Sequence, residues 1–389
     1  MKIVRNPRLD VDASGLSDWN KPENRRWGFH HLWQMCRYGL IIRSPYVLAL
    51  EAAPDSRIPA LSSVREMTSR ASFSGLAVVQ HDRLLFEAYA PDFGPDQPHS
   101  MQSITKTSMH FVIGRLVDEG KIDPEKPVSH YIPEIGSGYA AAKVQQVLDM
   151  DVLNNFTEDY AGSYEFDPQP GVGVSYLRQE IAMGWRLPPE GESGMSMRGF
   201  TATLVSDDVE NRSGLCEYRS PNTDLLGWIA ERVSGRTLRD LLIEIVEAAG
   251  IEGCYYISTD CDGVPVVSGG GAMTARDLAR FGQLFVRWGA GVDGRQVAGQ
   301  RFMKTTRNGR GPTVNNCPYE VRYSNQTYTN GSWFGHPGFA GQFLMAHPET
   351  GLSIAYFGVL ETPDAIDDHT FNDIMGMSQD IIATLGMTR

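Results

Sequence analysis

Sequence patterns typical of β-strands lie near both ends of this 389-residue chain, and patterns typical of helices lie between them. Two apolar runs flank a polar turn at His81-Asp82-Arg83 within residues 73–90 and predict a hairpin. Residues 342–348 and 351–360 predict two more strands, and a final helix is expected over 364–385. Strands from both ends must share one sheet to bury their apolar faces, so we expect an α/β (α+β) fold in which an antiparallel sheet is flanked by helices.

The intervening residues predict a helical region inserted between the two halves of the sheet. Apolar periodicity indicates helices over 142–150, 195–206, 222–234, 237–249 and from Thr274 onward. A Gly- and Pro-rich stretch over 151–193 carries many aromatic residues, which argue against disorder and favour a functional loop.

These patterns divide the chain into three expected parts that together form one catalytic unit. Residues 1–60 are rich in proline and aromatic patches and predict an irregular N-terminal arm that wraps the molecule. Residues 61–140 and 255–389 are expected to form the sheet domain, and residues 141–254 the mainly helical region.

The charge of the chain excludes two classes of partner. Lysine and arginine number 35 against 47 acidic residues, and the net charge of −12 disfavours nucleic acid and anionic membrane surfaces. The first 20 residues contain no apolar stretch of the length that a secretory signal needs, and no apolar run of the chain reaches the length of a membrane span. Five scattered cysteines without a Cys-x-x-Cys pair indicate neither a disulfide framework nor a zinc ribbon, so a cytoplasmic location is expected.

The strongest chemical pattern is Ser103-Ile-Thr-Lys106, which opens an apolar segment that predicts a helix over 104–119. A spacing of three residues places the hydroxyl and the amine on one helix face, within reach of a shared proton. Burial among apolar neighbours would lower the pKa of the lysine and let it act as a base. The chain has only seven lysines and no second Ser-x-x-Lys, although a plain helix N-cap remains the alternative.

Two further segments are compatible with the same site. Tyr218 precedes Pro221 and an amphipathic helix, where its phenol could relay a proton if a nearby ammonium lowered its pKa. Gly338 and Gly341 open a late strand and permit a ligand to approach the backbone closely. Taken singly, Tyr218 is more typical of a half-buried core tyrosine, and the two glycines are equally typical of a bulged hairpin without function.

Taken in order, Ser103-Ile-Thr-Lys106, Tyr218-Arg-Ser220 and His336-Pro-Gly338 resemble the three motifs of the serine β-lactamase and penicillin-binding-protein superfamily. Within that superfamily the chain is most similar to the 6-aminohexanoate-dimer hydrolases, on segments such as "LVDEGKIDPEKPVSHYIPEI", "SPNTDLLGWIAERVSG" and "GGGAMTARDLARFG". The resemblance extends from about residue 20 to the C-terminus.

The resemblance implies a role for each matching residue. Ser103 would be the acylated nucleophile, Lys106 its general base, and Tyr218 the group that passes a proton to the leaving group. The backbone amides of Ser103 and Phe339 would form the oxyanion hole. Tyr160 would lie at the substrate pocket.

Other positions of the three motifs are expected to support the site. Ser220 and Asn222 would orient the loop of Tyr218 or cap the helix that follows it. His336 stands where β-lactamases carry a lysine that binds the β-lactam carboxylate, so penicillin hydrolysis is disfavoured. With no acidic deacylating residue identifiable, Lys106 and Tyr218 would also activate the hydrolytic water.

The sequence therefore predicts a serine hydrolase that cleaves amide bonds of small linear substrates, without metal or organic cofactor. A carboxylesterase and a catalytically silent binding or assembly protein are the alternatives, and a homodimer is compatible with either. The partner is expected to be a small-molecule amide or ester. The sequence does not support an α/β-hydrolase, because no Gly-x-Ser-x-Gly motif occurs. It does not support a zinc hydrolase either, because His30 and His31 are adjacent and no His-Glu-x-x-His motif exists.

Overall fold

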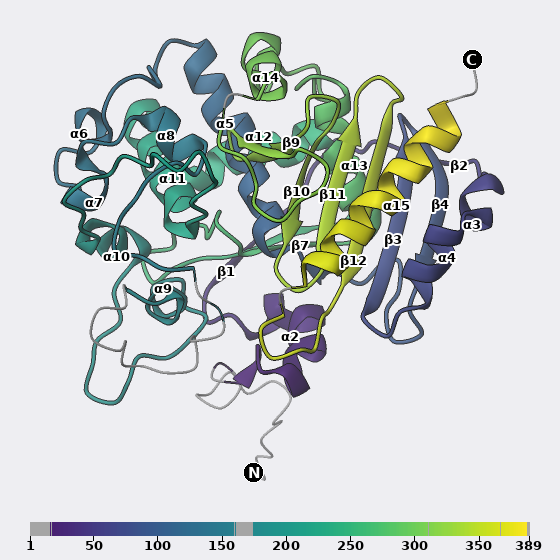
Figure 1. The fold of residues 1–389 in the computed structure, drawn as a ribbon, viewed down its shortest axis with the longest axis horizontal. Helices are drawn as coiled ribbons and strands as arrows, with labels where there is room; N and C mark the ends of the chain where they lie inside the picture. The colour runs from purple at the N-terminus through teal and green to yellow at the C-terminus, as the bar shows by residue number, and fades with distance from the viewer. Residues whose placement is uncertain are drawn as a thin grey trace.

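An eight-stranded sheet crosses one half of the molecule in the computed structural model, which describes residues 16, 18–158, 160, 174–309, 311–365 and 367–386 (Figure 1). The strand order is β2-β4-β3-β12-β11-β10-β9-β8, so strands from both ends of the chain meet where β3 pairs with β12. The strands are β2 (Glu51–Ala52), β3 (Phe73–Gln80), β4 (Arg83–Tyr89), β8 (Arg322–Ser324), β9 (Thr327–Thr329), β10 (Phe334–Gly338), β11 (Gln342–His347) and β12 (Leu352–Gly358). The antiparallel sheet expected from the sequence is confirmed, with β2 added parallel to β4.

The two faces of this sheet bury alternate residues of each strand. In β3, Leu76 and Val78 belong to one buried cluster, whereas Ala77 and Val79 belong to the other. Neighbouring side chains of a strand point to opposite faces, so a continuous apolar run needs cover on both sides.

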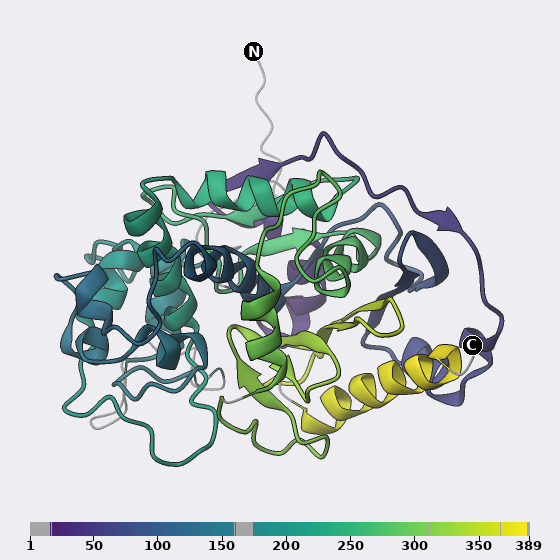
Figure 2. The ribbon, with the colours of Figure 1, turned by 90° about the horizontal axis from the view of Figure 1, so that it is seen from above.

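Helices supply that cover. Helix α13 (Ala275–Val286) packs on one face, and α15 (Asp368–Gly386) and α4 (Ser62–Ser69) pack on the other, as Figures 1 and 2 show. Thr274 caps α13, because its hydroxyl accepts a hydrogen bond from the amide of Asp277 at 3.1 Å. A short helix, α3 (Arg57–Ala60), precedes α4.

The helical region lies beside the sheet on the left of Figure 1. Its longer helices, α11 (Ser220–Ser234) and α12 (Leu238–Ala249), end at Gly235 and Gly250, which both adopt left-handed conformations that favour glycine. The remaining helices of this part and its borders are α6 (Val128–Tyr131), α7 (Ser137–Ala140), α8 (Val144–Leu148), α9 (Tyr176–Ala182), α10 (Met197–Thr203) and α14 (Gln300–Arg307).

The expected helix over residues 104–119 is divided in the structure. A 3₁₀ helix, η2 (Gln102–Lys106), is followed by α5 (Thr107–Asp118), and Gly120 after it has a positive φ of 70°. The apolar periodicity of the sequence does not distinguish a first turn in 3₁₀ conformation from one in α-helical conformation.

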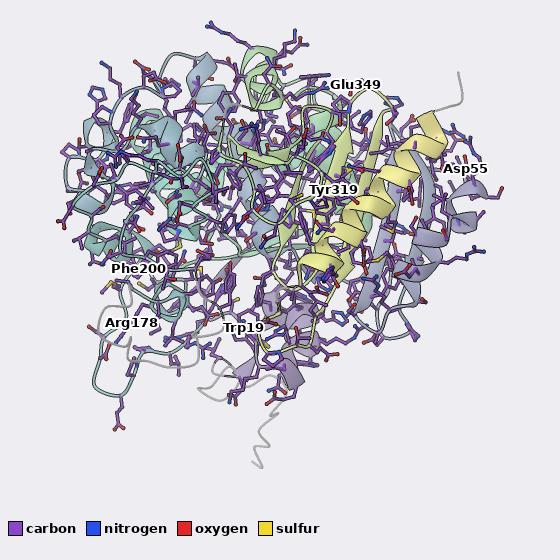
Figure 3. The ribbon with its side chains drawn as sticks, in the orientation of Figure 1. Trp19, Asp55, Arg178, Phe200, Tyr319 and Glu349 are labelled. Atoms are coloured by element: carbon purple, nitrogen blue, oxygen red, sulfur yellow. The ribbon has the colours of Figure 1, made fainter. Side chains whose placement is uncertain are left out.

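The expectation of an irregular arm over residues 1–60 was wrong for residues 22–35. Helix α2 (Pro22–Met35) begins at a proline and buries Arg25, whose guanidinium donates to the carbonyl groups of Leu360 and Thr362 at 2.7 and 2.6 Å. The sequence of α2 mixes charged and aromatic residues and shows no clear apolar periodicity, because the helix buries an arginine as well as apolar residues. Trp19, labelled in Figure 3, packs near this helix, with its ring centroid 5.9 Å from that of Phe29.

A second, four-stranded sheet was not expected from the sequence. Its order is β1-β6-β7-β5, with β1 (Gly39–Ile42), β5 (His99–Ser100), β6 (Tyr255–Ser258) and β7 (Gly271–Met273). The strands are two to four residues long, too short for alternation to show. The boundaries of the arm, sheet domain and helical region stay predictions.

Part of the predicted loop over 151–193 lies outside the described residues, including the aromatic residues Tyr164 and Phe166. The described residues contain no helix long and apolar enough to cross a membrane, and no group of three or more His, Cys, Asp or Glu side chains placed to hold a metal ion. None of the five cysteines, all of which the structure describes, forms a disulfide.

Candidate active site

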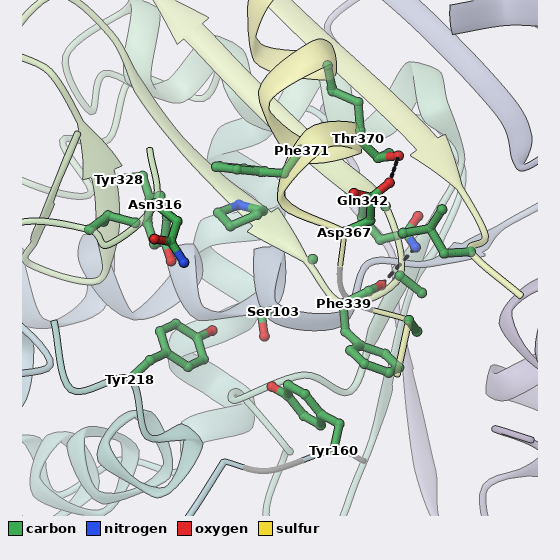
Figure 4. Close-up of a pocket in the computed structure, with 18 of the residues that line it drawn as sticks. Ser103, Tyr160, Tyr218, Asn316, Tyr328, Phe339, Gln342, Asp367, Thr370 and Phe371 are labelled. Carbon is green, nitrogen blue, oxygen red and sulfur yellow. Dashed lines mark hydrogen bonds between the residues drawn. The ribbon is translucent and has the colours of Figure 1, made fainter. Parts of the chain in front are cut away.

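Ser103 lies in η2, between the two sheets and the helical region. Gln102, immediately before it, has a left-handed φ of 48°, which is uncommon for a residue with a side chain and recurs at functional sites. The turn is held in place because Met101 donates its amide to the carbonyl of Gly271 at 2.9 Å. The Ser103 side chain is thereby presented at the floor of a pocket (Figure 4).

Lys106 is fully buried and its amine lies against Ser103. Its Nζ is 3.0 Å from Ser103 Oγ, 2.9 Å from Ser220 Oγ and 2.5 Å from the carbonyl oxygen of Ser268. Burial lowers the pKa of Lys106 to about 8 because the charged form loses its hydration. The lysine and the serine predicted to act together are therefore in contact, with the amine largely neutral in mildly alkaline solution.

A carboxylate that the sequence analysis did not assign, Glu158, completes this hydrogen-bonded group. Its Oε1 accepts from the hydroxyl of Ser220 at 2.6 Å and from that of Tyr160 at 2.7 Å, and its Oε2 accepts from the Ser220 amide at 2.8 Å. A continuous chain of hydrogen bonds thus joins Ser103, Lys106, Ser220, Glu158 and Tyr160. The only sequence signal for Glu158 is its place two residues before Tyr160.

A second carboxylate, Asp224, lies on another side of Lys106. It accepts from the amide of Ser268 at 3.1 Å and from the side chain of Gln179 at 3.3 Å. Burial raises the pKa of Asp224 to about 7, against the opposing attraction of Lys106. Asp224 holds the residue whose carbonyl binds the lysine, so both carboxylates help to keep the amine in place.

Tyr218 lies across the pocket from this group, with its hydroxyl directed toward Ser103 in Figure 4. The hydroxyl is buried and makes no hydrogen bond to the residues that the structure describes. Lys106 Nζ is 5.0 Å from the centre of the Tyr218 ring, yet burial, reinforced by the nearby Tyr323 and Tyr328, holds the pKa of the Tyr218 phenol well above 10. The lowered pKa on which the proton relay was premised is therefore not found, and the Tyr218 phenol is protonated.

The third motif forms the end of strand β10 and borders the pocket. Pro337, Gly338 and Phe339 line the pocket, whereas His336 is buried behind them. His336 Nδ1 donates to the carbonyl of Pro337 at 2.5 Å, so its Nε2 accepts from the hydroxyl of Tyr323 at 3.2 Å. Burial lowers the pKa of His336 to about 3, and the ring is neutral.

Gly338 allows β10 to approach η2 closely. A Cβ atom at this position would lie 2.5 Å from the carbonyl oxygen of Met101, closer than real contacts permit. Gly338→Ala is expected to separate Phe339 from Ser103 and to lower kcat/KM for ester hydrolysis at least about tenfold, since small displacements at reacting groups cost about 10²-fold. Steady-state kinetics on the purified variant measure this.

Gly94→Ala is the matched control, because nothing lies within 4 Å of a Cβ at Gly94. It should retain the kcat/KM of the parent protein. A Gly338→Ala variant that also retains full kcat/KM would contradict the close approach of the two segments.

Two other predicted residues have different surroundings. Tyr160 lines the pocket, and its ring centroid is 4.6 Å from that of Phe339. Asn222 does not line the pocket; its side-chain oxygen accepts from the hydroxyl of Tyr139 at 2.7 Å in the interior of the helical region. Asn222 therefore anchors the first turn of α11.

Fold and site together define the class of β-lactamase-like serine hydrolases. A family model described as Beta-lactamase matches residues 63–372, and the chain belongs to this family. It is a hydrolase with a β-lactamase/transpeptidase-like fold, as its sequence motifs predict.

Among individual proteins, the chain is 30% identical over 377 residues to a 6-aminohexanoate-dimer hydrolase of Paenarthrobacter ureafaciens, covering 93% of this chain and 92% of that one. A solved Bacillus anthracis protein, provisionally designated a 6-aminohexanoate-dimer hydrolase, matches with a TM-score of 0.79 at 21% identity over 99% of each chain. A D-stereospecific amidohydrolase from Streptomyces matches with a TM-score of 0.56 at 18% identity, covering 83% of this chain and 98% of that one. The two structural likenesses show the fold.

Proposed function

We propose that this protein hydrolyses amide and ester bonds of small linear substrates through an acyl-enzyme on Ser103. The observation that carries the proposal is the contact of 3.0 Å between Ser103 Oγ and the buried amine of Lys106, at the floor of a pocket. A buried lysine with a pKa of about 8 is a suitable base near neutral pH. A binding protein with no chemistry to perform has no need of such an amine.

Acylation begins when neutral Lys106 takes the hydroxyl proton of Ser103 as Oγ bonds to the substrate carbonyl carbon. The negative charge on the carbonyl oxygen is accepted by the backbone amides of Ser103 and Phe339. The bond to the leaving group breaks as Tyr218 gives that group its phenolic proton, and Lys106 returns a proton to Tyr218. The high pKa of the phenol suits a group that must be protonated at this step.

Deacylation repeats these steps with water. Lys106 takes a proton from the water as its oxygen attacks the acyl carbon, and Ser103 Oγ recovers a proton when the acid product leaves. The carboxylate of Glu158 stays hydrogen-bonded to Ser220 and Tyr160, so it orients the lysine and the pocket wall.

Cleavage of amides, rather than esters alone, is supported by the position of Tyr218. An amine leaves only when its nitrogen is protonated, and Tyr218, whose hydroxyl is directed toward Ser103 in Figure 4, is the proposed donor of that proton. A cytoplasmic location is a further proposal, supported by the absence of disulfides among the five cysteines. A homodimer stays a prediction of the sequence.

A fluorophosphonate probe tests the proposal directly, because it labels only activated serine nucleophiles. Mass spectrometry of the native protein should show one added probe group on Ser103, and the Ser103→Ala variant should show none. Heat-unfolded protein serves as the control for non-specific reaction. Equal labelling of Ser103→Ala and the parent protein, or no labelling of the native protein, would reject the enzyme.

A further inference from the structure

Arg25 in helix α2 is fully buried and forms no ion pair with a carboxylate among the described residues. Its guanidinium donates to the backbone and side-chain oxygens of Asn20 at 3.1 and 3.0 Å. It also donates to the carbonyl groups of Leu360, Thr362 and Pro363, at 2.7, 2.6 and 3.4 Å. Burial of an unpaired charge is costly, and well-packed apolar residues often replace buried charges without loss of stability. Arg25 is therefore a poor choice if its role is packing alone.

The segment that binds Arg25 also holds the turn between β10 and β11. Leu360, whose carbonyl accepts from the guanidinium, donates its own amide to the carbonyl of Ala340 at 2.9 Å. Ala340 has a left-handed φ of 64°, a conformation that is strained for a residue with a side chain and persists only when the surroundings hold it. Arg25 thus supports the backbone of this turn through Leu360.

Arg25 also contacts the side chain of Phe339, the residue before Ala340. The guanidinium carbon lies 5.6 Å from the centre of the Phe339 ring. A cation within about 6 Å of an aromatic ring is attracted to its face. The same ring lies beside that of Tyr160 in Figure 4, with 4.6 Å between the ring centroids. Arg25 therefore restrains Phe339 in two ways, through its ring and through the backbone that follows it.

The backbone amide of Phe339 is the second donor of the oxyanion hole in the mechanism proposed above. Such a donor must lie within hydrogen-bonding distance of the oxygen that becomes negative, and a displacement of about 1 Å costs about 10²-fold in rate. We propose that Arg25, which lies outside the pocket lining, is a positioning residue that keeps the Phe339 amide directed at the oxyanion. The proposal rests on the acyl-enzyme mechanism and adds a residue to it.

An ester and a thionoester with the same acyl chain and leaving group test it, namely p-nitrophenyl hexanoate and its thiocarbonyl analogue. Sulfur accepts hydrogen bonds weakly, so the thionoester gains little from the oxyanion hole. Arg25→Met should lower kcat/KM for the ester at least about tenfold, and for the thionoester by less than about threefold. A variant with less folded protein would lower both values by the same factor. Equal losses for the two substrates, or no loss, would overturn the proposal.

Arg26→Met is the matched control on the same helix. Arg26 pairs with Asp92 at 2.6 Å and donates to the carbonyl groups of Ala71 and Phe73 at 3.1 and 2.9 Å, none of which belongs to the turn at 338–341 or to residues 360–363. The ratio of kcat/KM for the ester to that for the thionoester should equal the parental ratio, even where the thermal unfolding temperature falls.

Arg25→Lys provides a second variant, which keeps the charge but not the fork of donors. An ammonium group cannot make the same set of hydrogen bonds, so the ester-to-thionoester ratio should fall at least about threefold. This variant supplies the measurement where Arg25→Met does not fold. An unchanged ratio in folded Arg25→Lys would show that charge alone suffices and would overturn the positioning role of the fork.

The outcome also distinguishes this inference from the function on which it rests. Labelling of Ser103 and cleavage of the ester by the parent protein, with a ratio that the Arg25 variants leave unchanged, would retain the hydrolase and reject the role of Arg25. A parent protein that neither labels nor cleaves the ester would reject both.

Discussion

Lys106→Met should lower kcat/KM for ester hydrolysis by about 10³-fold, within the range of 10² to 10⁴ that a positioned acid or base contributes. Methionine keeps the length and apolar stem of the lysine but has no basic nitrogen. The hydroxyl of Ser103 would then lack an acceptor for its proton, and two carboxylates, Glu158 and Asp224, would lose the cation between them. The rate of fluorophosphonate labelling at Ser103 should fall in parallel with kcat/KM.

Lys126→Met provides the control, because Lys126 is exposed in a loop after α5. It should label and turn over substrate as the parent protein does. Thermal unfolding of Lys106→Met separates loss of chemistry from loss of fold. A folded Lys106→Met protein that labels at the parental rate would show that Ser103 is activated by another group.

The pKa of Lys106 also predicts how activity depends on pH. The amine acts as a base only when it is neutral, so kcat/KM should fall as the pH falls through about 8. Four titratable groups face the amine: Glu158 and Asp224 stabilise its charge, whereas Tyr218 and His336 are neutral at pH 8. Removing either negative charge should therefore lower the pKa of Lys106, and the pH at which kcat/KM falls to half its maximum should move to a lower value.

Glu158→Gln is expected to show that shift together with a loss of about 10²-fold in kcat/KM above pH 9, where Lys106 is neutral in both proteins. Glu158 accepts three hydrogen bonds, from the Ser220 amide and from the hydroxyl groups of Ser220 and Tyr160. Glutamine has one acceptor oxygen and an amino group that cannot accept, so buried donors would be left unpaired and Ser220 would no longer hold the lysine.

Asp224→Asn offers a comparison that isolates charge, because asparagine can still accept from the Ser268 amide through its oxygen. Its pH profile should move in the same direction, with a smaller loss of kcat/KM at high pH. Profiles of kcat/KM between pH 5 and 10 measure both effects. A midpoint that moves to higher pH in either variant would be inconsistent with carboxylates that stabilise the ammonium.

The long strands of the eight-stranded sheet could be predicted from the sequence because the pattern that specifies each strand lies in consecutive residues. Residues 73–90 and 342–360 carry continuous apolar runs bounded by turns, and such runs form strands wherever cover is available on both faces. The short strands β5, β6 and β7 carry no comparable signal, since two to four residues are stabilised by their partners rather than by their own pattern. Helix α2 was missed for a related reason: the guanidinium of its buried Arg25 is satisfied in part by carbonyl groups more than 300 residues away, besides the nearby Asn20.

By itself, the sequence determined which residues are available for chemistry: one Ser-x-x-Lys at the mouth of an apolar helix, a tyrosine before Pro221, and glycines at a late strand. Only the tertiary structure decided their protonation and their partners. Burial sets the pKa of Lys106 and of Tyr218, and burial depends on packing between segments more than 100 residues apart, such as Lys106 with Ser220 and Ser268. The place of Glu158 within the site was settled in the same way, because a carboxylate acquires its role from the groups that surround it in the folded chain.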